Sequence, residues 1–62
     1  MIPQDYFDKV KAYFDGDERK TWLWFKTPNP QFGLLSPLNM LKLGREKKVM
    51  QFINSAIMEN RL

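Results

Sequence analysis

The sequence of 62 residues contains no cysteine and no histidine. Without cysteine the chain can form neither a disulfide nor a thiolate metal site. Without histidine it lacks the usual nitrogen ligand for a metal and the usual general base, so catalysis by a Ser-His or Cys-His pair is excluded. A chain this short is marginally stable alone, so its stability must come from aromatic packing or from a partner.

Long apolar runs are also missing. No stretch approaches the roughly 20 residues of a membrane span, and the first residues do not place a basic region before an apolar one. We therefore expect no membrane span, no signal peptide and a cytoplasmic location. What the chain does have is nine aromatic residues, two Trp, two Tyr and five Phe. Many of them recur at helical spacing, which predicts that they form the core.

The positive charge lies in the second half of the chain. Residues 1–31 hold five basic and five acidic side chains, whereas residues 32–62 hold five basic and two acidic ones, which gives the net charge of +3. This mild excess indicates an acidic partner surface rather than the dense basic stripe of a dedicated DNA-binding protein. The basic residues of the second half are Lys42, Arg45, Lys47, Lys48 and Arg61.

We predict an all-α fold, a single domain over residues 1–62 built as a small bundle of about four helices. The apolar periodicity predicts helices over about 3–14, 17–26, 37–43 and 45–60. Asp17 and Ser36 are expected N-caps, and Pro37 suits the first position of the third helix. Gly16 and Gly44 are expected to end the first and third helices, because glycine tolerates a left-handed conformation.

Four consecutive residues, Trp22 to Phe25, are apolar all round the second helix. They cannot all face one core, so at least one is expected to be exposed or covered by another chain. Because Trp24 shares an arc with Thr21 and Phe25, we expect Trp24 to be buried and Trp22 to be more exposed. The loop that follows is expected to be rigid, with Phe32 turned inward and Gly33 at positive φ.

Catalytic and metal-binding chemistry find little support in the remaining residues. Five acidic residues gather near the first helix, but lysines and arginines are interleaved with them and helix capping explains two. Asp15-Gly16-Asp17-Glu18 lacks the spacing of a calcium loop. We therefore expect no enzyme, no cofactor and no metal site. The acidic residues are Asp5, Asp8, Asp15, Asp17 and Glu18.

Nucleic-acid binding is an alternative that the sequence leaves open. Basic and aromatic residues alternate in the second helix, where Trp22 and Trp24 could stack on bases. The third and fourth helices, joined at Gly44, also have the outline of a helix-turn-helix, with basic residues at the start of the fourth. Many short helical proteins share this weak pattern. Without a clear helix-turn-helix domain we favour a protein partner.

The stretch from Trp24 to Leu41 carries the most specific pattern in the chain. It resembles the W-L-x-x-P-N-x-x-(L/F)-G-x-x-(S/T)-P-L-x-x-L signature of the toxin-binding domain in MbcA/ParS/Xre-type antitoxins, and the similarity extends over about residues 20–60. The matching positions are Trp24, Phe25, Pro28, Asn29, Phe32, Gly33, Ser36, Pro37, Leu38, Leu41, Gly44 and Val49.

The resemblance implies a small helical antitoxin domain from a bacterial toxin–antitoxin system. Its partner would be a RES-domain toxin that acts on NAD or transfers ADP-ribose from it, and whose active site the antitoxin blocks, partly with its C-terminal end. Where the family usually has Gly-Gly, this chain has Gly33-Leu34, and Asn60 lies near a glycine that often closes the last helix. Only the first helix stands where most members carry a helix-turn-helix region, so toxin binding is implied more than operator binding.

Candidate partner-binding residues lie in two groups. Met58, Arg61 and Leu62 follow the fourth helix or leave its core-facing stripe, and Arg61 could pair with an acidic group of the partner. A frayed terminus is the alternative for these residues. The second group is Trp22, Leu34 and Leu35. An interaction module with a partner other than a toxin is a further alternative, and a homo-oligomer stays open.

Overall fold

The computed structural model describes residues 2–62, and within them the elements are helical. The all-α class and the bundle of four helices are confirmed. The predicted boundaries agree closely with the structure, and the largest difference is at the C-terminal end, where the last helix stops at Met58 rather than Asn60. The helices are α1 (Gln4–Tyr13), α2 (Glu18–Lys26), α3 (Pro37–Lys42) and α4 (Glu46–Met58), with a 3-10 helix η1 (Pro30–Phe32) before α3.

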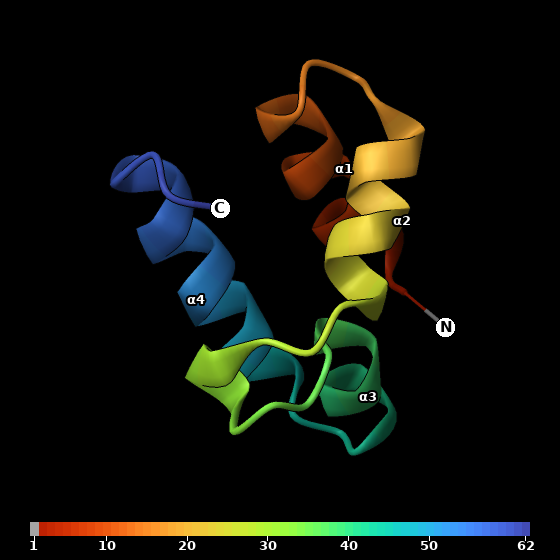
Figure 1. Cartoon of the computed structure of the whole chain (residues 1–62), viewed down its shortest axis with the longest axis vertical. Helices are drawn as coiled ribbons and strands as arrows, with labels where there is room; N and C mark the ends of the chain where they lie inside the picture. Colours follow the sequence, from red (N-terminus) through yellow and green to blue (C-terminus); the bar gives the residue numbers. More distant parts are fainter. Residues whose placement is uncertain (1) are drawn as a thin grey trace.

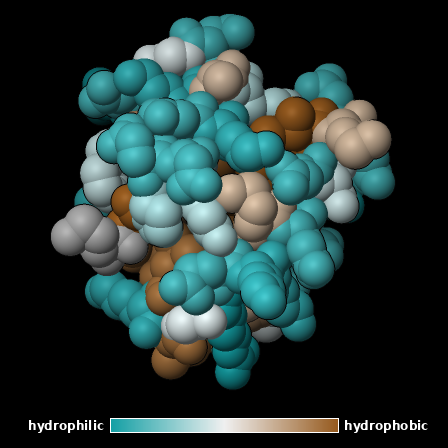
Figure 2. Space-filling view, turned by 180° about the vertical axis from the view of Figure 1, so that it is seen from behind, coloured by the Kyte–Doolittle hydropathy of each residue, from teal (hydrophilic) through white to brown (hydrophobic). Residues whose placement is uncertain are grey.

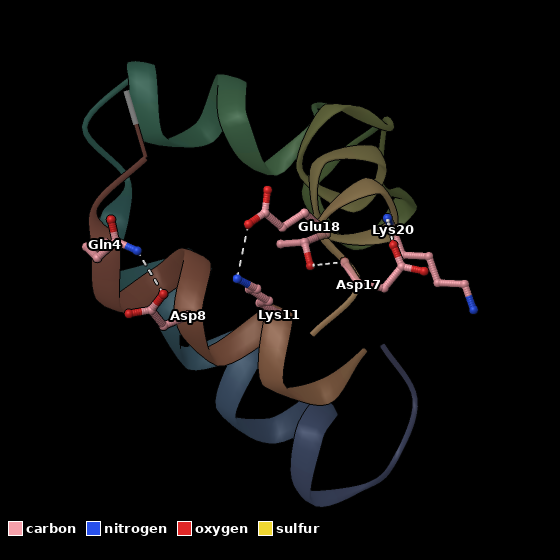
Figure 3. Close-up of polar contacts among 7 residues, drawn as sticks. Gln4, Asp8, Lys11, Asp17, Glu18 and Lys20 are labelled. Atoms are coloured by element: carbon pink, nitrogen blue, oxygen red, sulfur yellow. Dashed lines mark hydrogen bonds and ion pairs between the residues drawn. The ribbon is translucent and has the colours of Figure 1, made fainter. Parts of the chain in front are cut away.

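Two helices begin at the N-caps that the sequence predicts. The Asp17 side chain accepts a hydrogen bond of 3.1 Å from the backbone N–H of Lys20 at the start of α2. The Ser36 hydroxyl accepts one of 3.1 Å from the backbone N–H of Asn39 at the start of α3. Each bond satisfies a donor that the first helical turn leaves free. Figure 3 shows the Asp17 cap next to the Lys11–Glu18 ion pair of 3.1 Å, which joins α1 to the first turn of α2.

Three helices end in the same way. The backbone N–H groups of Gly16, Arg45 and Arg61 each bond to a carbonyl five residues earlier. The residue before each of them bonds to a carbonyl three residues earlier and lies at positive φ. This pair of bonds defines the Schellman motif. The left-handed positions are Asp15 (φ 56°), Gly44 (φ 77°) and Asn60 (φ 54°).

The core forms where the apolar stripes of all four helices meet. From α1 only Val10 is fully buried, and Phe25 is the buried aromatic of α2. Phe32 is buried at 6% exposure, as predicted, and it closes the core from the loop side. The buried hydrophobic residues of the core are Val10, Phe25, Phe32, Met40, Leu41, Val49, Ile53 and Ala56.

The four helices form a closed chain of contacts around this core. α1 packs on α2, α2 on α3, α3 on α4, and α4 on α1. Figure 1 shows α4 on one side, α1 and α2 on the other, and α3 at the end where the loop after α2 crosses over. Within residues 2–62, no helix has the length and apolar character needed to cross a membrane.

Candidate protein-binding surface

A stack of aromatic rings connects α2, η1 and α4. The Trp24 and Phe52 rings lie nearly parallel, with an interplanar angle of 10° and centroids 6.4 Å apart. Phe32 from η1 meets Phe52 edge-on at 5.2 Å, and Phe25 meets Trp24 edge-on at 5.0 Å. Ring pairs of this kind add to the free energy gained from burial. The stack fixes the position of the loop relative to α4.

The C-terminal turn folds back onto this stack. The Arg61 guanidinium lies over the Phe52 ring, 5.6 Å from its centroid, and its Nε donates to the Glu59 carboxylate. The Tyr13 hydroxyl donates a hydrogen bond of 2.9 Å to the Asn60 side-chain oxygen. Leu62 is half-buried against the core cluster. Leu62, which the helical positions assigned to the polar side, therefore helps to cover the core.

A polar hollow runs along the outer side of α4. It has a volume of about 260 Å³, with Phe32 and Phe52 as its apolar lining and polar side chains from α4, η1 and the C-terminal turn around it. Its α4 residues Lys48, Gln51 and Ser55 share one helical stripe with Met58, because these four positions fall within an arc of about 80°. Met58 is 86% exposed. We call this region the α4 surface; it consists of Gln31, Lys48, Gln51, Ser55, Met58 and Arg61.

The loop that supplies Gln31 to the α4 surface contains an unusual leucine. Gly33 and Leu34 both have positive φ, 65° and 71°, and Leu34 is 68% exposed. Positive φ is expected for glycine but costs a leucine energy, because its Cβ crowds the backbone. The next residue, Leu35, is half-buried against the core and pairs with Asn29 in an isolated antiparallel bridge. Leu34 and Leu35 therefore have different surroundings, and only Leu34 is available to a partner.

Trp22 lies apart from the α4 surface. Its ring packs on Phe7 of α1 at 5.2 Å, and the Lys26 ammonium lies 5.3 Å from its centroid. Trp22 is 43% exposed, whereas Trp24 is half-buried. The predicted order of exposure of the two tryptophans is confirmed, but Trp24 is not fully buried because part of it lines a second hollow.

This second hollow is apolar and lies along α2. It has a volume of about 290 Å³ and is lined by Phe14, Lys20, Leu23, Trp24 and Thr27. Leu23 is 66% exposed, so both Leu23 and Trp22 are apolar residues of α2 that lie outside the core. The wheel did not single out Leu23, since it gives no information on which neighbouring helix covers which side. We call this region the α2 hollow.

In the described part of the chain, no three His, Cys, Asp or Glu residues lie together in a way that could hold a metal ion. Burial raises the pKa of Tyr6 above 10.0, and the carboxylates of Asp5 and Glu46 add to this effect. The Tyr6 hydroxyl donates a 3.1 Å hydrogen bond to the Glu46 carbonyl, which ties α1 to the start of α4. Tyr6 therefore has a structural contact.

The six candidate residues are thus only partly brought together. Met58 and Arg61 belong to the α4 surface, and Leu34 lies in the loop that borders it; Leu35 and Leu62 pack inward, and Trp22 packs on α1. The face seen in Figure 2 is largely hydrophilic, with hydrophobic atoms in separate patches. On this face the exposed hydrophobic atoms therefore form small, separate groups.

Comparison of this chain with protein-family models, with curated proteins and with solved structures finds no match. The resemblance to the antitoxin family stays a prediction from the residues quoted above.

Proposed function

We propose that this chain is a non-enzymatic protein-binding domain of the antitoxin type, which binds a RES-type, NAD-consuming toxin and covers its active site. The partner contacts the α4 surface and the neighbouring Leu34. Leu34 is the observation that carries the proposal, because it combines a φ of 71° with 68% exposure. The resemblance of residues 20–60 to the toxin-binding domain supports the choice of partner.

The loop holds Leu34 in this conformation through a hydrogen bond of 3.0 Å from its backbone N–H to the Asn29 carbonyl, but its side chain stays mostly exposed. A left-handed backbone costs a residue other than glycine about 1–2 kcal/mol. Leucine has no polar group to bond its own backbone there, and its side chain is mostly in water. A partner that buried this side chain would regain about 1–2 kcal/mol from the hydrophobic effect, enough to offset the strain. Strain of this kind at an exposed apolar residue favours a binding role.

Other residues of the signature have roles in the fold itself. The Asn29 side chain accepts a 2.9 Å hydrogen bond from the Gln31 N–H and caps η1, and Ser36 caps α3. Gly33 takes the left-handed position at the end of η1. These residues shape the loop, so the partner-specific contacts of the proposal fall on Leu34 and on the α4 surface instead.

The proposal is tested by calorimetric titration of a purified RES-type toxin with the full chain and its variants. Leu34→Ala and Met58→Ala should each weaken binding by about tenfold, equivalent to about 1.4 kcal/mol. Leu43→Ala is the matched control, because Leu43 is 58% exposed but lies at the end of α3. Circular dichroism checks folding, and loss of NAD in the presence of the toxin measures inhibition. A toxin that is neither bound nor inhibited overturns the proposal.

Single substitutions are preferable to removal of residues 59–62. That segment contains the Asn60 turn, its bond to Tyr13 and the Leu62 packing, so a truncated chain would lose stability as well as binding surface.

A further inference from the structure

The basic residues around the α3–α4 corner are not neutralised within the fold. In the part of the chain that the structure describes, the two ion pairs are Lys11–Glu18 and Arg61–Glu59. Neither involves the four exposed cations of this corner, and Glu46 is the single acidic residue among them. An uncompensated positive patch of this kind attracts an anionic partner. The four cations are Lys42, Arg45, Lys47 and Lys48.

Lys48 connects this patch to the polar hollow of the α4 surface. Arg61 also lines this hollow, and it uses its Nε for Glu59, which leaves its terminal amino groups free to donate. The amides of Gln31 and Gln51 line the same hollow, and their side chains make no hydrogen bond within residues 2–62. Cations of this kind bind carboxylates, and the amides can bond to a peptide backbone.

The same hollow is poorly suited to a nucleic acid. Binding to single strands relies on exposed aromatic faces on which bases stack. The Phe52 ring is covered by Trp24 in parallel, by Phe32 at its edge and by the Arg61 guanidinium. No free aromatic face is left in the hollow for a base. The chemistry of the lining therefore favours an acidic protein segment over an oligonucleotide.

We infer that the hollow of the α4 surface binds a carboxylate-bearing segment of the partner protein, with Lys48 and Arg61 as its cationic groups and Gln31 and Gln51 as its amide groups. This inference rests on the proposed function, because it specifies the chemistry of the epitope that the α4 surface recognises. It makes Lys48, which the sequence did not single out, a residue that determines specificity.

The test is an NMR titration of the isotope-labelled chain with three probes: a short glutamate-rich peptide, the same peptide with glutamine for each glutamate, and an oligo-dT of equal charge. The glutamate peptide should shift the amide signals of Gln31, Lys48, Gln51 and Ser55, and the glutamine peptide should not. Lys48→Gln should weaken the glutamate peptide at least about threefold. Arg19→Gln, which removes the same charge from exposed α2, should not.

Two results of the NMR titration would overturn the inference. Equal losses for Lys48→Gln and Arg19→Gln would mean attraction by net charge alone, and tighter binding of oligo-dT at the same signals would mean a nucleic-acid surface. The proposed function is judged separately by the toxin titration. If Lys48→Gln binds the toxin as tightly as the parent chain, the inference fails but the proposed function stands. If the glutamate peptide binds in the hollow but the toxin does not bind, the proposed function fails but the inference stands.

Discussion

The C-terminal turn and the loop of residues 29–35 each hold a residue other than glycine at positive φ, but only the residue of the C-terminal turn also bonds to the fold through its side chain. Asn60 closes α4 in a Schellman motif and accepts a hydrogen bond from Tyr13. Leu34 has comparable backbone strain and its backbone N–H donates to the Asn29 carbonyl, but its side chain is apolar and mostly exposed. Asparagine is also among the few residues that adopt this conformation readily. The side-chain bond accounts for Asn60 within the fold, whereas for Leu34 the proposal assigns the role of its side chain to partner binding.

Both regions depend on the aromatic stack beneath them, so the largest effect should come from Trp24→Ala. The substitution removes the parallel contact with Phe52 and the edge contact with Phe25, and we expect a loss of about 3 kcal/mol in the free energy of unfolding. Trp22→Ala is the matched control, because Trp22 is 43% exposed and should lose about 1 kcal/mol. Denaturant titration measures both. Equal losses would mean that the stack does not support the two regions.

Asn60→Ala tests the folding side of the comparison. Alanine tolerates positive φ poorly and cannot accept the bond from Tyr13, so we expect a loss of about 1 kcal/mol. Asn60→Gly keeps the left-handed conformation and should lose less than Asn60→Ala. The thermal midpoints of the two variants separate backbone conformation from side-chain bonding. A midpoint for Asn60→Ala equal to that of the parent chain would show that the turn does not contribute to stability.

Leu34→Gly tests the binding side, where stability and binding should change in opposite directions. Glycine relieves the strain of about 1–2 kcal/mol but adds freedom to the unfolded chain, so we expect a net gain in stability of about 0.5 kcal/mol. Leu34→Ala keeps the strain and removes most of the side chain. Both variants should weaken toxin binding to the same extent, since both lack the leucine side chain. A loss of stability in Leu34→Gly would contradict the assignment of strain to this residue.

The predictable parts of this fold are those that depend on neighbours in the sequence. Asp17 and Ser36 cap helices through bonds to residues three positions away, and Gly44 ends α3 through its own backbone, so each signal is local. The inward packing of Leu62 could not be predicted, because it lies beyond the end of α4 and a helical wheel does not apply there. The turn that brings it back depends on a contact between residues 13 and 60.

The candidate surface also contains some residues whose position could be predicted from the sequence and others whose position could not. Met58 could be placed outside the core stripe from its helical position, and the structure finds it 86% exposed. Lys48 was counted only among the basic residues of the second half, because its position in one hollow with Gln31 and Arg61 requires three separate elements to meet. Leu34 was noted from the family pattern, but its strain became visible only in the backbone angles.

The smallest expected effect is the pH dependence of the contact between Tyr6 and Glu46, which ties α1 to the start of α4. Burial and the nearby Asp5 and Glu46 raise the pKa of Tyr6 above its ordinary value of 10.0. As pH rises past 10.0, the unfolded chain loses the Tyr6 proton before the folded chain does. The contribution of Tyr6 to the free energy of unfolding is therefore complete below that pH and is lost as pH rises through the folded pKa. Near neutral pH, Tyr6→Phe should be slightly less stable than the parent chain, because it lacks the bond to the Glu46 carbonyl. Phenylalanine does not titrate, so only the parent chain loses stability in alkali, and the deficit of the variant should shrink there. Denaturant titrations of both chains across this pH range measure the deficit, and a deficit that stays constant would show that Tyr6 titrates alike in both states.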